Sequence, residues 1–163
     1  MGVEEREVMP KLYMLVGVPA AGKSTWLEKN NGNKVMVASS DAYLDRIAAS
    51  QGKTYNDVFA DNIKAANNHA LSVAKQAFEL NLDLIWDQTN LNRKSRGPKL
   101  AMVPDHYEKI AVYFPTPDKA EHERRLASRP GKSIPHNILM GMIRGLEKPT
   151  QAEGFDEIIE VKP

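Results

Sequence analysis

The chain contains no cysteine. This absence excludes disulfides and thiolate metal sites, and it is typical of proteins kept in a reducing intracellular compartment. No stretch approaches the roughly 18 consecutive apolar residues that a membrane span needs, and Met1–Pro10 lacks the apolar core of a secretory signal. We therefore expect a soluble, cytoplasmic protein with no membrane partner.

A large surplus of basic residues is also lacking, because 22 Lys and Arg are balanced by 21 Asp and Glu, leaving a net charge of +1. Proteins that hold many duplex phosphates are strongly basic, so extended duplex binding is not expected. A short single-stranded end needs only a few local cations, and two clusters offer them. The competing interpretation of both clusters is a solvated helix face. The clusters are Arg93, Lys94, Arg96 and Lys99, and Arg124, Arg125 and Arg129.

The histidines do not form a metal site by their spacing. No histidine has a second one three or four residues away, the spacing that puts two ligands on one face of a helix. We therefore predict no zinc. The residues concerned are His69, His106, His122 and His136.

The length of 163 residues fits one domain with one hydrophobic core. We find no internal repeat, low-complexity tract or interdomain linker. We expect a flexible lead-in over residues 1–10 and a single domain over residues 11–163.

Short apolar runs alternate with segments of helical spacing, which predicts an α/β fold with a doubly wound, mostly parallel sheet of about five strands. The alanines at 65, 66, 70, 74 and 77 predict a close-packing surface on the longest helix. The expected strands are Leu12–Val16, Val35–Ala38, Leu82–Trp86, Ile110–Phe114 and Ile158–Val161. The expected helices are Lys23–Asn30, Asp41–Ser50, Asn56–Leu80, Arg93–Met102, Pro117–Ser128 and Pro135–Leu146.

The segment Gly17–Ser24 matches the P-loop (Walker A) pattern G-x-x-x-x-G-K-[ST], between an apolar strand and a helical segment. Its glycines let backbone N–H groups converge on phosphate oxygens, and the following helix points its positive end at the same anion. We expect Lys23 to contact the β and γ phosphates and Ser24 to bind Mg2+. The predicted cofactors are ATP, or another NTP, and Mg2+. The residues expected to bind the nucleotide are Gly17, Ala20, Ala21, Gly22, Lys23, Ser24 and Thr25.

Two carboxylates, Asp41 and Asp87, end two other predicted strands. In an open α/β sheet, ligands bind beyond the carboxyl ends of the strands. A phosphoryl acceptor needs a carboxylate to take its proton, and Mg2+ needs a carboxylate to hold it or its waters. We interpret Asp41 as the general base and Asp87 as part of the Mg2+ site; the alternative for each is a helix N-cap.

Arg125 and Arg129 lie four residues apart on one face of a predicted helix, before a helical lid expected from roughly Arg129 to Leu146. A mobile arginine segment that closes over the donor stabilises the charge on a transferring phosphoryl group, which makes both arginines catalytic candidates. The alternative is that they complement the dipole at the end of the helix.

Together these segments resemble the 5′-polynucleotide kinase family, in particular the kinase domain of phage nucleic acid repair enzymes. The resemblance implies transfer of the ATP γ-phosphate to the 5′-hydroxyl of single-stranded or nicked RNA or DNA, in the cytoplasm, including that of a phage-infected host. It gives Asp41 the role of general base, Lys23 and Ser24 that of the P-loop pair, and Arg125 and Arg129 that of lid arginines. The matching segments are GVPAAGKSTW at Gly17–Trp26, SSDAYLD at Ser39–Asp45, DQTNLN at Asp87–Asn92 and RLASRPGKSIP at Arg125–Pro135.

The acceptor site is where the chain departs from the family pattern. Leu44 stands where the family has an arginine, three residues after the general base, and Arg46 offers a cation from the next turn. With Asp41, Arg46 and the Thr89 and Asn90 of the D-x-T-N box form the expected acceptor site. No D-x-D-G-T sequence occurs, so a kinase without the phosphatase domain is expected.

Two alternatives remain open. The D-Q-T-N box and the segment Phe155–Val161 also resemble the P-loop domain of heterogeneous nuclear ribonucleoprotein U-type proteins, which implies a nucleotide-binding, RNA-binding module without transferase activity. A binding module does not need Asp41. The other alternative is a small-molecule kinase that acts on a nucleoside, sugar or antibiotic hydroxyl, for which a closed apolar pocket is expected.

Overall fold

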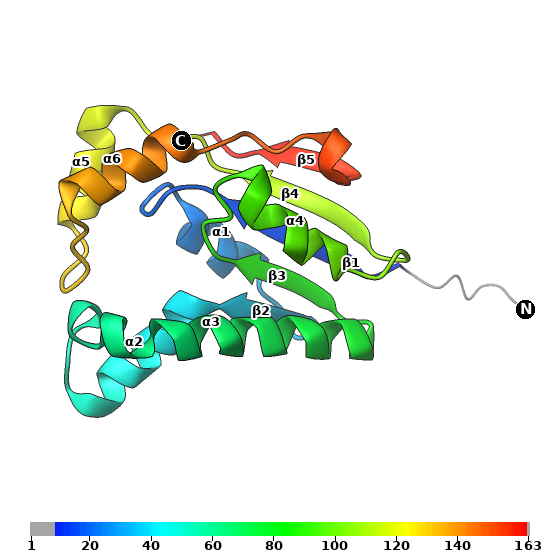
Figure 1. Cartoon of the computed structure of the whole chain (residues 1–163), viewed down its shortest axis with the longest axis horizontal. Helices are drawn as coiled ribbons and strands as arrows, with labels where there is room; N and C mark the ends of the chain where they lie inside the picture. Colours follow the sequence, from blue (N-terminus) through cyan, green and yellow to red (C-terminus); the bar gives the residue numbers. More distant parts are fainter. Residues whose placement is uncertain (1–8, 163) are drawn as a thin grey trace, which may run out of the picture.

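The computed structural model of the chain describes residues 9–162, in which strands and helices alternate (Figure 1). Among these residues, no helix has both the length and the apolarity needed to cross a bilayer. The strands are β1 Lys11–Val16, β2 Val35–Ser39, β3 Asp83–Asp87, β4 Glu108–Tyr113 and β5 Glu157–Glu160. The helices are α1 Lys23–Asn30, α2 Ser40–Gln51, α3 Tyr55–Leu80, α4 Arg93–Ala101, α5 Lys119–Ala127 and α6 His136–Gly145, with a 3-10 turn, η1, at Gln151–Glu153.

The five strands form one sheet in the order β2-β3-β1-β4-β5, and every neighbouring pair is parallel. The carboxyl ends of all five strands therefore meet at one edge. Figure 1 shows the loop after β1, the start of α2 and the α5–α6 region at this edge, far from the N-terminus. The predicted fold class, a doubly wound parallel sheet of the P-loop type, is confirmed.

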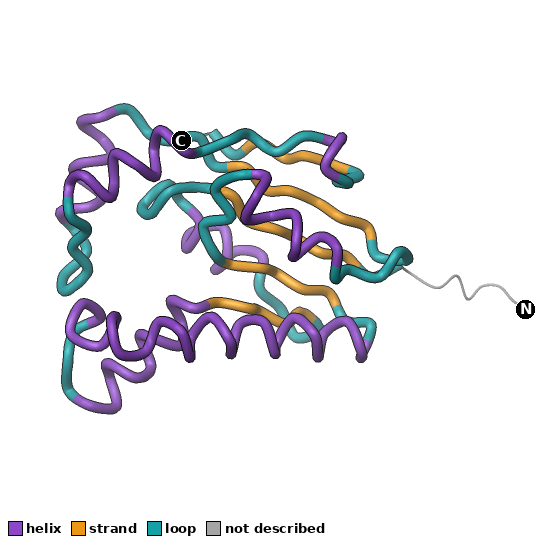
Figure 2. Tube along the Cα trace, in the orientation of Figure 1, coloured by secondary structure: helices purple, strands orange, loops and turns teal. Residues whose placement is uncertain are grey.

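Each face of the sheet is covered by its own apolar core. Helices α3 and α4 lie on one face, over a cluster that includes Met14, Leu84 and Trp86. Helix α1 and the end of α6 cover the other face, over Leu15, Ile85 and neighbouring side chains. Figure 2 shows helices on both sides of the strands. Alternate residues of β1 and β3 thus enter opposite cores, as expected for strands buried on both faces.

The alanines of α3 let this long helix pack closely on its neighbours, with Ala70, Ala74 and Ala77 in the core over the sheet and Ala66 in the core shared with α2. Ala66, Ala70, Ala74 and Ala77 are fully buried, whereas Ala65 is exposed. A residue without atoms beyond Cβ lets helix and strand backbones approach closely, so the predicted close-packing surface is confirmed at four of its five positions.

The elements begin and end within two residues of their predicted bounds, and local contacts explain the differences. Helix α5 begins at Lys119, because the Asp118 carboxylate caps it by accepting from the Glu121 N–H at 3.0 Å. Strand β4 begins at Glu108, because this residue pairs with Lys11 at the start of β1. The first difference depends on a cap and the second on a partner strand.

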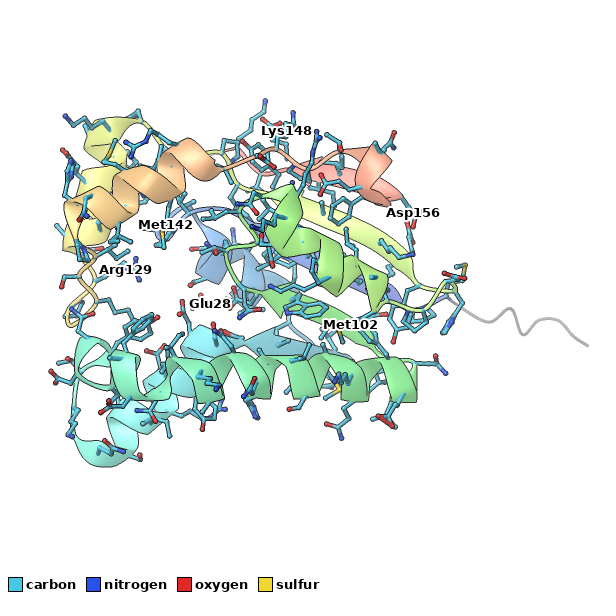
Figure 3. The ribbon with its side chains drawn as sticks, in the orientation of Figure 1. Glu28, Met102, Arg129, Met142, Lys148 and Asp156 are labelled. Atoms are coloured by element: carbon cyan, nitrogen blue, oxygen red, sulfur yellow. The ribbon has the colours of Figure 1, made fainter. Side chains whose placement is uncertain are left out.

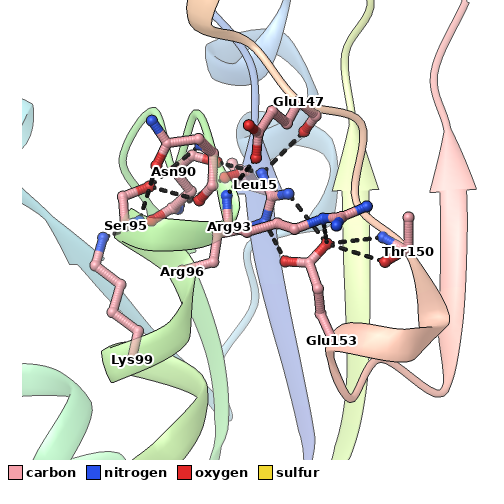
Figure 4. Close-up of polar contacts among 10 residues, drawn as sticks. Leu15, Asn90, Arg93, Ser95, Arg96, Lys99, Glu147, Thr150 and Glu153 are labelled. Atoms are coloured by element: carbon pink, nitrogen blue, oxygen red, sulfur yellow. Dashed lines mark hydrogen bonds and ion pairs between the residues drawn. The ribbon is translucent and has the colours of Figure 1, made fainter.

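Arg96 belongs to a cation cluster for which either a nucleic-acid end or a solvated helix face was expected, and neither describes it. Its side chain is fully buried (0% exposed), and its Nε and Nη2 donate to the two carboxylate oxygens of Glu153 at 2.8 and 3.1 Å (Figure 4). Its Nη1 donates to the Asn90 and Glu147 carbonyls. The residue is a structural tie between α4, the loop after β3 and η1.

This arrangement predicts a large loss of stability for Arg96→Met. Removing one member of a buried pair leaves the other charge unpaired, which costs about 3 to 5 kcal/mol. Arg93→Met, on the same helix, is the control, because the Arg93 side chain is 65% exposed and lies 3.9 Å from Glu153; a change of about 0.5 kcal/mol or less is expected. Denaturant unfolding measures both. Equal losses in the two variants would contradict the structural role of Arg96.

Candidate active site

The P-loop leaves β1 at Val16 in a conformation with little room for side chains. A Cβ at Gly17 would lie 3.0 Å from the Phe114 Cβ, so only glycine fits here without a shift. The Gly17 N–H donates to the Thr89 carbonyl at 3.0 Å, which ties the loop to the end of β3. Ala20 and Gly22 have positive φ angles of 65° and 113°. This alternation turns successive N–H groups inward, the geometry of an anion-binding nest.

The N-terminus of α1 points into the same loop. Gly22 is its N-cap residue, so no side chain satisfies the first N–H groups of the helix, and its first turn carries no acidic residue. These N–H groups and the positive end of the helix dipole are directed at an anion beyond the loop. The cradle therefore fits a nucleotide phosphate.

Lys23 lies at the centre of the site. Its Nζ donates to the Gly17 and Val18 carbonyls at 2.6 and 2.9 Å, so the side chain is folded back over the loop. Burial lowers the pKa of Lys23 to about 8, while the charges of Asp87 and Asp41 oppose this shift. The two carboxylates predicted from the sequence are thus close enough to act on the P-loop lysine.

Asp41 lies in the first turn of α2 and is exposed. It is not the cap of this helix, because the Ser39 hydroxyl accepts from the Ala42 N–H and fills that role. The Tyr55 hydroxyl, at the start of α3, donates to Asp41 Oδ1 at 2.6 Å. Burial and this bond raise the pKa of Tyr55. One carboxylate oxygen of Asp41 is therefore oriented by Tyr55, and the other is left for a substrate hydroxyl.

Asp87 ends β3 beside Ser39, whose hydroxyl donates to Asp87 Oδ2 at 3.0 Å. Burial raises the pKa of Asp87, against the effects of the Ser39 bond and the Lys23 charge. No group of three or more His, Asp or Glu side chains gathers into a metal site within residues 9–162. A hydroxyl from Ser24 and one carboxylate suit Mg2+, which keeps several waters and takes further oxygens from substrate phosphates.

Arg125 and Arg129, which the sequence predicts to be lid arginines, differ in their surroundings. Arg125 donates to Glu121 at 2.7 Å and approaches the Ala20 carbonyl of the P-loop at 3.5 Å. Arg129 has a buried Nη1 without a hydrogen-bond partner in the described part of the chain, and its charge acts on Lys23. A buried guanidinium nitrogen without an acceptor is costly. An incoming phosphate oxygen would supply the missing acceptor.

The segment between α5 and α6 reaches across to the corner between α2 and α3. The Gly131 carbonyl accepts from the Asn56 N–H at 3.0 Å, and Lys132 pairs with Asp45 at 3.1 Å. The Lys132 Nζ also lies 4.8 Å from the centre of the Tyr55 ring. Figure 3 shows Arg129 in this segment, on the side that faces α2 and α3. The segment thus bridges the P-loop side and the Asp41 side of the site.

Asn90, expected at the acceptor, has a structural role instead. It is buried, its φ is 47°, and its side-chain amide donates to the Leu15 carbonyl at 2.8 Å (Figure 4). Its side-chain oxygen accepts from Lys99. The nitrogen and the oxygen of the Asn90 side chain thus both bond within the protein, and its predicted contact with an acceptor stays a prediction.

The other acceptor candidates lie nearer the surface. Thr89 is half-buried beside the P-loop and gives its carbonyl to Gly17. Arg46 is exposed on α2, with its guanidinium carbon 6.0 Å from the centre of the Tyr43 ring. Leu44, in place of the family arginine, is fully buried in the core between α2 and α3. Arg46 is therefore the basic residue that α2 offers to an acceptor.

Three contacts of the site were not predicted from the sequence: Tyr55 with Asp41, Ser39 with Asp87, and the buried His122 ring nitrogen 2.9 Å from the Pro19 carbonyl. Each joins residues from different elements. Ser39 is in a segment that the family resemblance singles out, so a polar residue two positions before Asp41 was available as a signal. Tyr55 and His122 had no such signal.

The parallel order of the strands, the P-loop with its lysine and the carboxylates beyond neighbouring strands define the class as a P-loop kinase-like α/β domain. A family model described as "AAA domain" matches residues 12–149, most of the chain, and the chain belongs to this family. Such a fold implies nucleotide binding, typically with Mg2+.

Solved structures share this fold at low sequence identity. A candidate kinase of Chloroflexus aurantiacus is 18% identical, with a TM-score of 0.69 over 95% of this chain and 89% of the other. A chain of the Pnkp1/Rnl/Hen1 RNA repair complex is 19% identical, with a TM-score of 0.62 over 86% of this chain and 45% of the other. Shikimate kinase from Acinetobacter baumannii is 19% identical, with a TM-score of 0.53 over 96% of this chain and 86% of the other. At these identities the likeness shows the fold and not the acceptor.

The position of Lys23 predicts a specific loss of nucleotide binding. In Lys23→Met the cradle keeps its backbone N–H groups but lacks the ammonium group, so we expect ATP affinity to fall at least about tenfold, equivalent to about 1.4 kcal/mol. Lys29→Met, in the last turn of the same helix, is the charge-matched control. Titration with a fluorescent ATP analogue and Mg2+ measures both. An unchanged affinity in Lys23→Met would contradict the assignment of the cradle.

Proposed function

We propose that the protein is an ATP-dependent kinase that transfers the γ-phosphoryl group to the 5′-hydroxyl end of a nucleic acid. The observation that carries the transfer step is the convergence of charged groups from four places in the chain. The charges of Asp41, Asp87 and Arg129 all act on the pKa of the P-loop lysine Lys23. A cation cradle on one side and an exposed carboxylate on the other are the parts that phosphoryl transfer needs.

In the proposed reaction, the Asp41 carboxylate accepts the proton of the acceptor hydroxyl as that oxygen bonds to the γ-phosphorus, and the bond from the γ-phosphorus to the β–γ bridging oxygen breaks. Tyr55 orients Asp41 through the 2.6 Å hydrogen bond. Lys23, Arg125 and Arg129 stabilise the negative charge on the transferring group. Ser24 and Asp87 would hold Mg2+, which neutralises charge on the phosphates when it is bound.

A nucleic-acid acceptor is supported by the segments that resemble 5′-polynucleotide kinases and by the likeness of the fold to a chain of an RNA repair complex. Asp41 and Arg46 are both exposed on α2, so an extended nucleic-acid strand can reach the proposed general base, Asp41. The chain spans 45% of the repair-complex chain, so the remaining activities of that protein are not inferred for this one.

A small-molecule kinase is the second candidate. Its specific support is that the chain and shikimate kinase match over most of both lengths. The α5–α6 segment also contacts the corner beside Asp41, as expected of a lid over a small acceptor. An RNA-binding module without transferase activity is the third candidate. The presence of Asp41 disfavours it, because binding alone does not need this carboxylate.

The proposal predicts transfer of labelled γ-phosphate from ATP to a short 5′-hydroxyl RNA or to a DNA of matched sequence. Asp41→Asn removes the proton acceptor and keeps the shape, so kcat is expected to fall about a hundredfold or more. Asp61→Asn is the matched control, because Asp61 is an exposed aspartate on α3 and its loss should leave kcat unchanged.

The outcomes separate the three candidates. Label on either oligonucleotide that disappears in Asp41→Asn supports the 5′-hydroxyl kinase. Label only on nucleosides or sugars identifies a small-molecule kinase. Binding of ATP and RNA with no transfer to any hydroxyl points to the binding module, and it contradicts the proposed function.

A further inference from the structure

A pocket of about 320 Å³ lies between α3 and α4, outside the residues used in the proposed transfer step. Figure 1 shows these two helices on the same face of the sheet. The wall from α3 consists of Asn67, Asn68 and Leu71, the floor is Trp86 at the end of β3, and Gln88 and Lys99 complete the lining. No acidic residue lines the pocket.

Lys99 is a part-buried cation that pairs with no carboxylate of residues 9–162. Its Nζ donates to Gln88 Oε1 at 2.8 Å and to the side-chain oxygen of Asn90, and it lies 5.3 Å from the centre of the Trp86 ring. Burial lowers the pKa of Lys99 to about 8, and no carboxylate contributes to the shift. An ammonium group has three N–H donors, so one is left for a ligand.

The amides of the pocket also present donors. Gln88 uses its whole side chain within the protein: its oxygen accepts from Trp86 and Lys99, and its Nε2 donates to Ser40 and Asn67. The bond from Gln88 to Asn67 Oδ1, 3.1 Å long, leaves the Asn67 Nδ2 donors for other partners. A pocket that offers N–H donors and a positive charge suits an anion with several acceptor oxygens.

The pocket is connected to the proposed general base through one hydrogen bond. Gln88 follows Asp87, and its Nε2 donates to the Ser40 hydroxyl, one residue before Asp41, at 3.2 Å. A nucleic-acid strand that presents its 5′-hydroxyl to Asp41 carries its next phosphates away from the P-loop, so other cations must hold them. Lys99 offers a cation in the pocket that this hydrogen bond connects to the residue before Asp41.

We propose that the pocket between α3 and α4 is an anion subsite, in which Lys99 and the Asn67 amide bind a backbone phosphate of the acceptor strand. The source of the phosphate rests on the proposed function; the anion subsite itself does not. A lysine that only supported Gln88 and Asn90 would need to donate hydrogen bonds but would not need a charge or a ligand.

The test places a negative charge in the pocket without touching the contacts of Lys99. Asn68 is exposed on α3 and lines the pocket, so Asn68→Asp repels an anion there. Gln76→Glu adds the same charge to an exposed position of the same helix outside this lining. Lys99→Gln, which keeps a hydrogen-bond donor and loses the charge, is the second variant. Thermal unfolding of each variant is recorded beside the kinetics.

The acceptors are a series of 5′-hydroxyl hexanucleotides. Each carries a single neutral methylphosphonate, and its position moves by one phosphodiester linkage from one hexanucleotide to the next. For the unmodified chain we expect one linkage at which the neutral group raises the acceptor KM about tenfold, the loss of one charged contact. Asn68→Asp and Lys99→Gln should raise KM for the normal strand by a similar factor and abolish the preference at that linkage, with KM for ATP unchanged. If Asn68→Asp and Gln76→Glu have the same acceptor KM, and the neutral linkage still raises KM in Asn68→Asp, the subsite is refuted.

A failure of the proposed function is distinguishable from a failure of the subsite. If the unmodified chain labels no oligonucleotide, the side-chain amide resonances of Asn67, which is present in every variant, are followed by NMR during titration with inorganic phosphate. Saturable shifts that are lost in Asn68→Asp and retained in Gln76→Glu uphold an anion subsite whose ligand is another phosphate compound. The absence of such shifts, or equal shifts in both variants, overturns the inference.

Discussion

The buried side chain of Asn90 holds together the parts on which the site depends. Its amide donates to the Leu15 carbonyl, which fixes the end of β1 against the end of β3, and the neighbouring Thr89 carbonyl accepts from Gly17 at the first position of the P-loop. Arg96 holds the Asn90 carbonyl and is itself fixed by Glu153. The positive φ of Asn90 is costly for most residues but is compensated here by a complete set of hydrogen bonds. These hydrogen bonds of Asn90, Thr89 and Arg96 form a clamp between β1, β3 and α4, which sets the positions of the P-loop cradle and of Asp87.

The site combines this rigid side with an adaptable one. Lys23, Ser24 and Asp87 are carried by the sheet edge and the clamp, whereas Arg129 belongs to the segment that reaches the α2–α3 corner through polar contacts at the surface. The ion pair of Lys132 with Asp45 lies at the surface, where such pairs contribute little stability, and Asn56 adds hydrogen bonds to Gly131 and Ser133. The proposed function assigns a phosphate oxygen to the Arg129 Nη1, which has no hydrogen-bond partner among residues 9–162. Donor binding and closure are therefore expected to be coupled.

The sheet and the P-loop were predictable because their signals are local: apolar runs, helical spacing and a motif between a strand and a helix. Asp41 and Asp87 were found because parallel strands bring their carboxyl ends to one edge, whatever the details of packing. The structural role of Asn90 was not predicted because a motif does not show whether a polar side chain bonds to its own backbone. The contacts of Arg96 with Glu153 and of Tyr55 with Asp41 were not predicted, because each joins two elements whose relative position depends on packing and is not given by a local sequence pattern.

In the proposed function, the P-loop, α2 and the α5–α6 segment act together on one phosphoryl group. The most direct measurement is a crystal structure of the chain with ADP, Mg2+ and aluminium fluoride, which imitates the transferring group. We expect that Lys23 Nζ and the Arg129 guanidinium both donate to the fluoride group, with the Asp41 carboxylate on the side opposite ADP. An Arg129 that stays without a contact to the fluoride group, or an Asp41 that lies on the ADP side of it, would contradict this joint action.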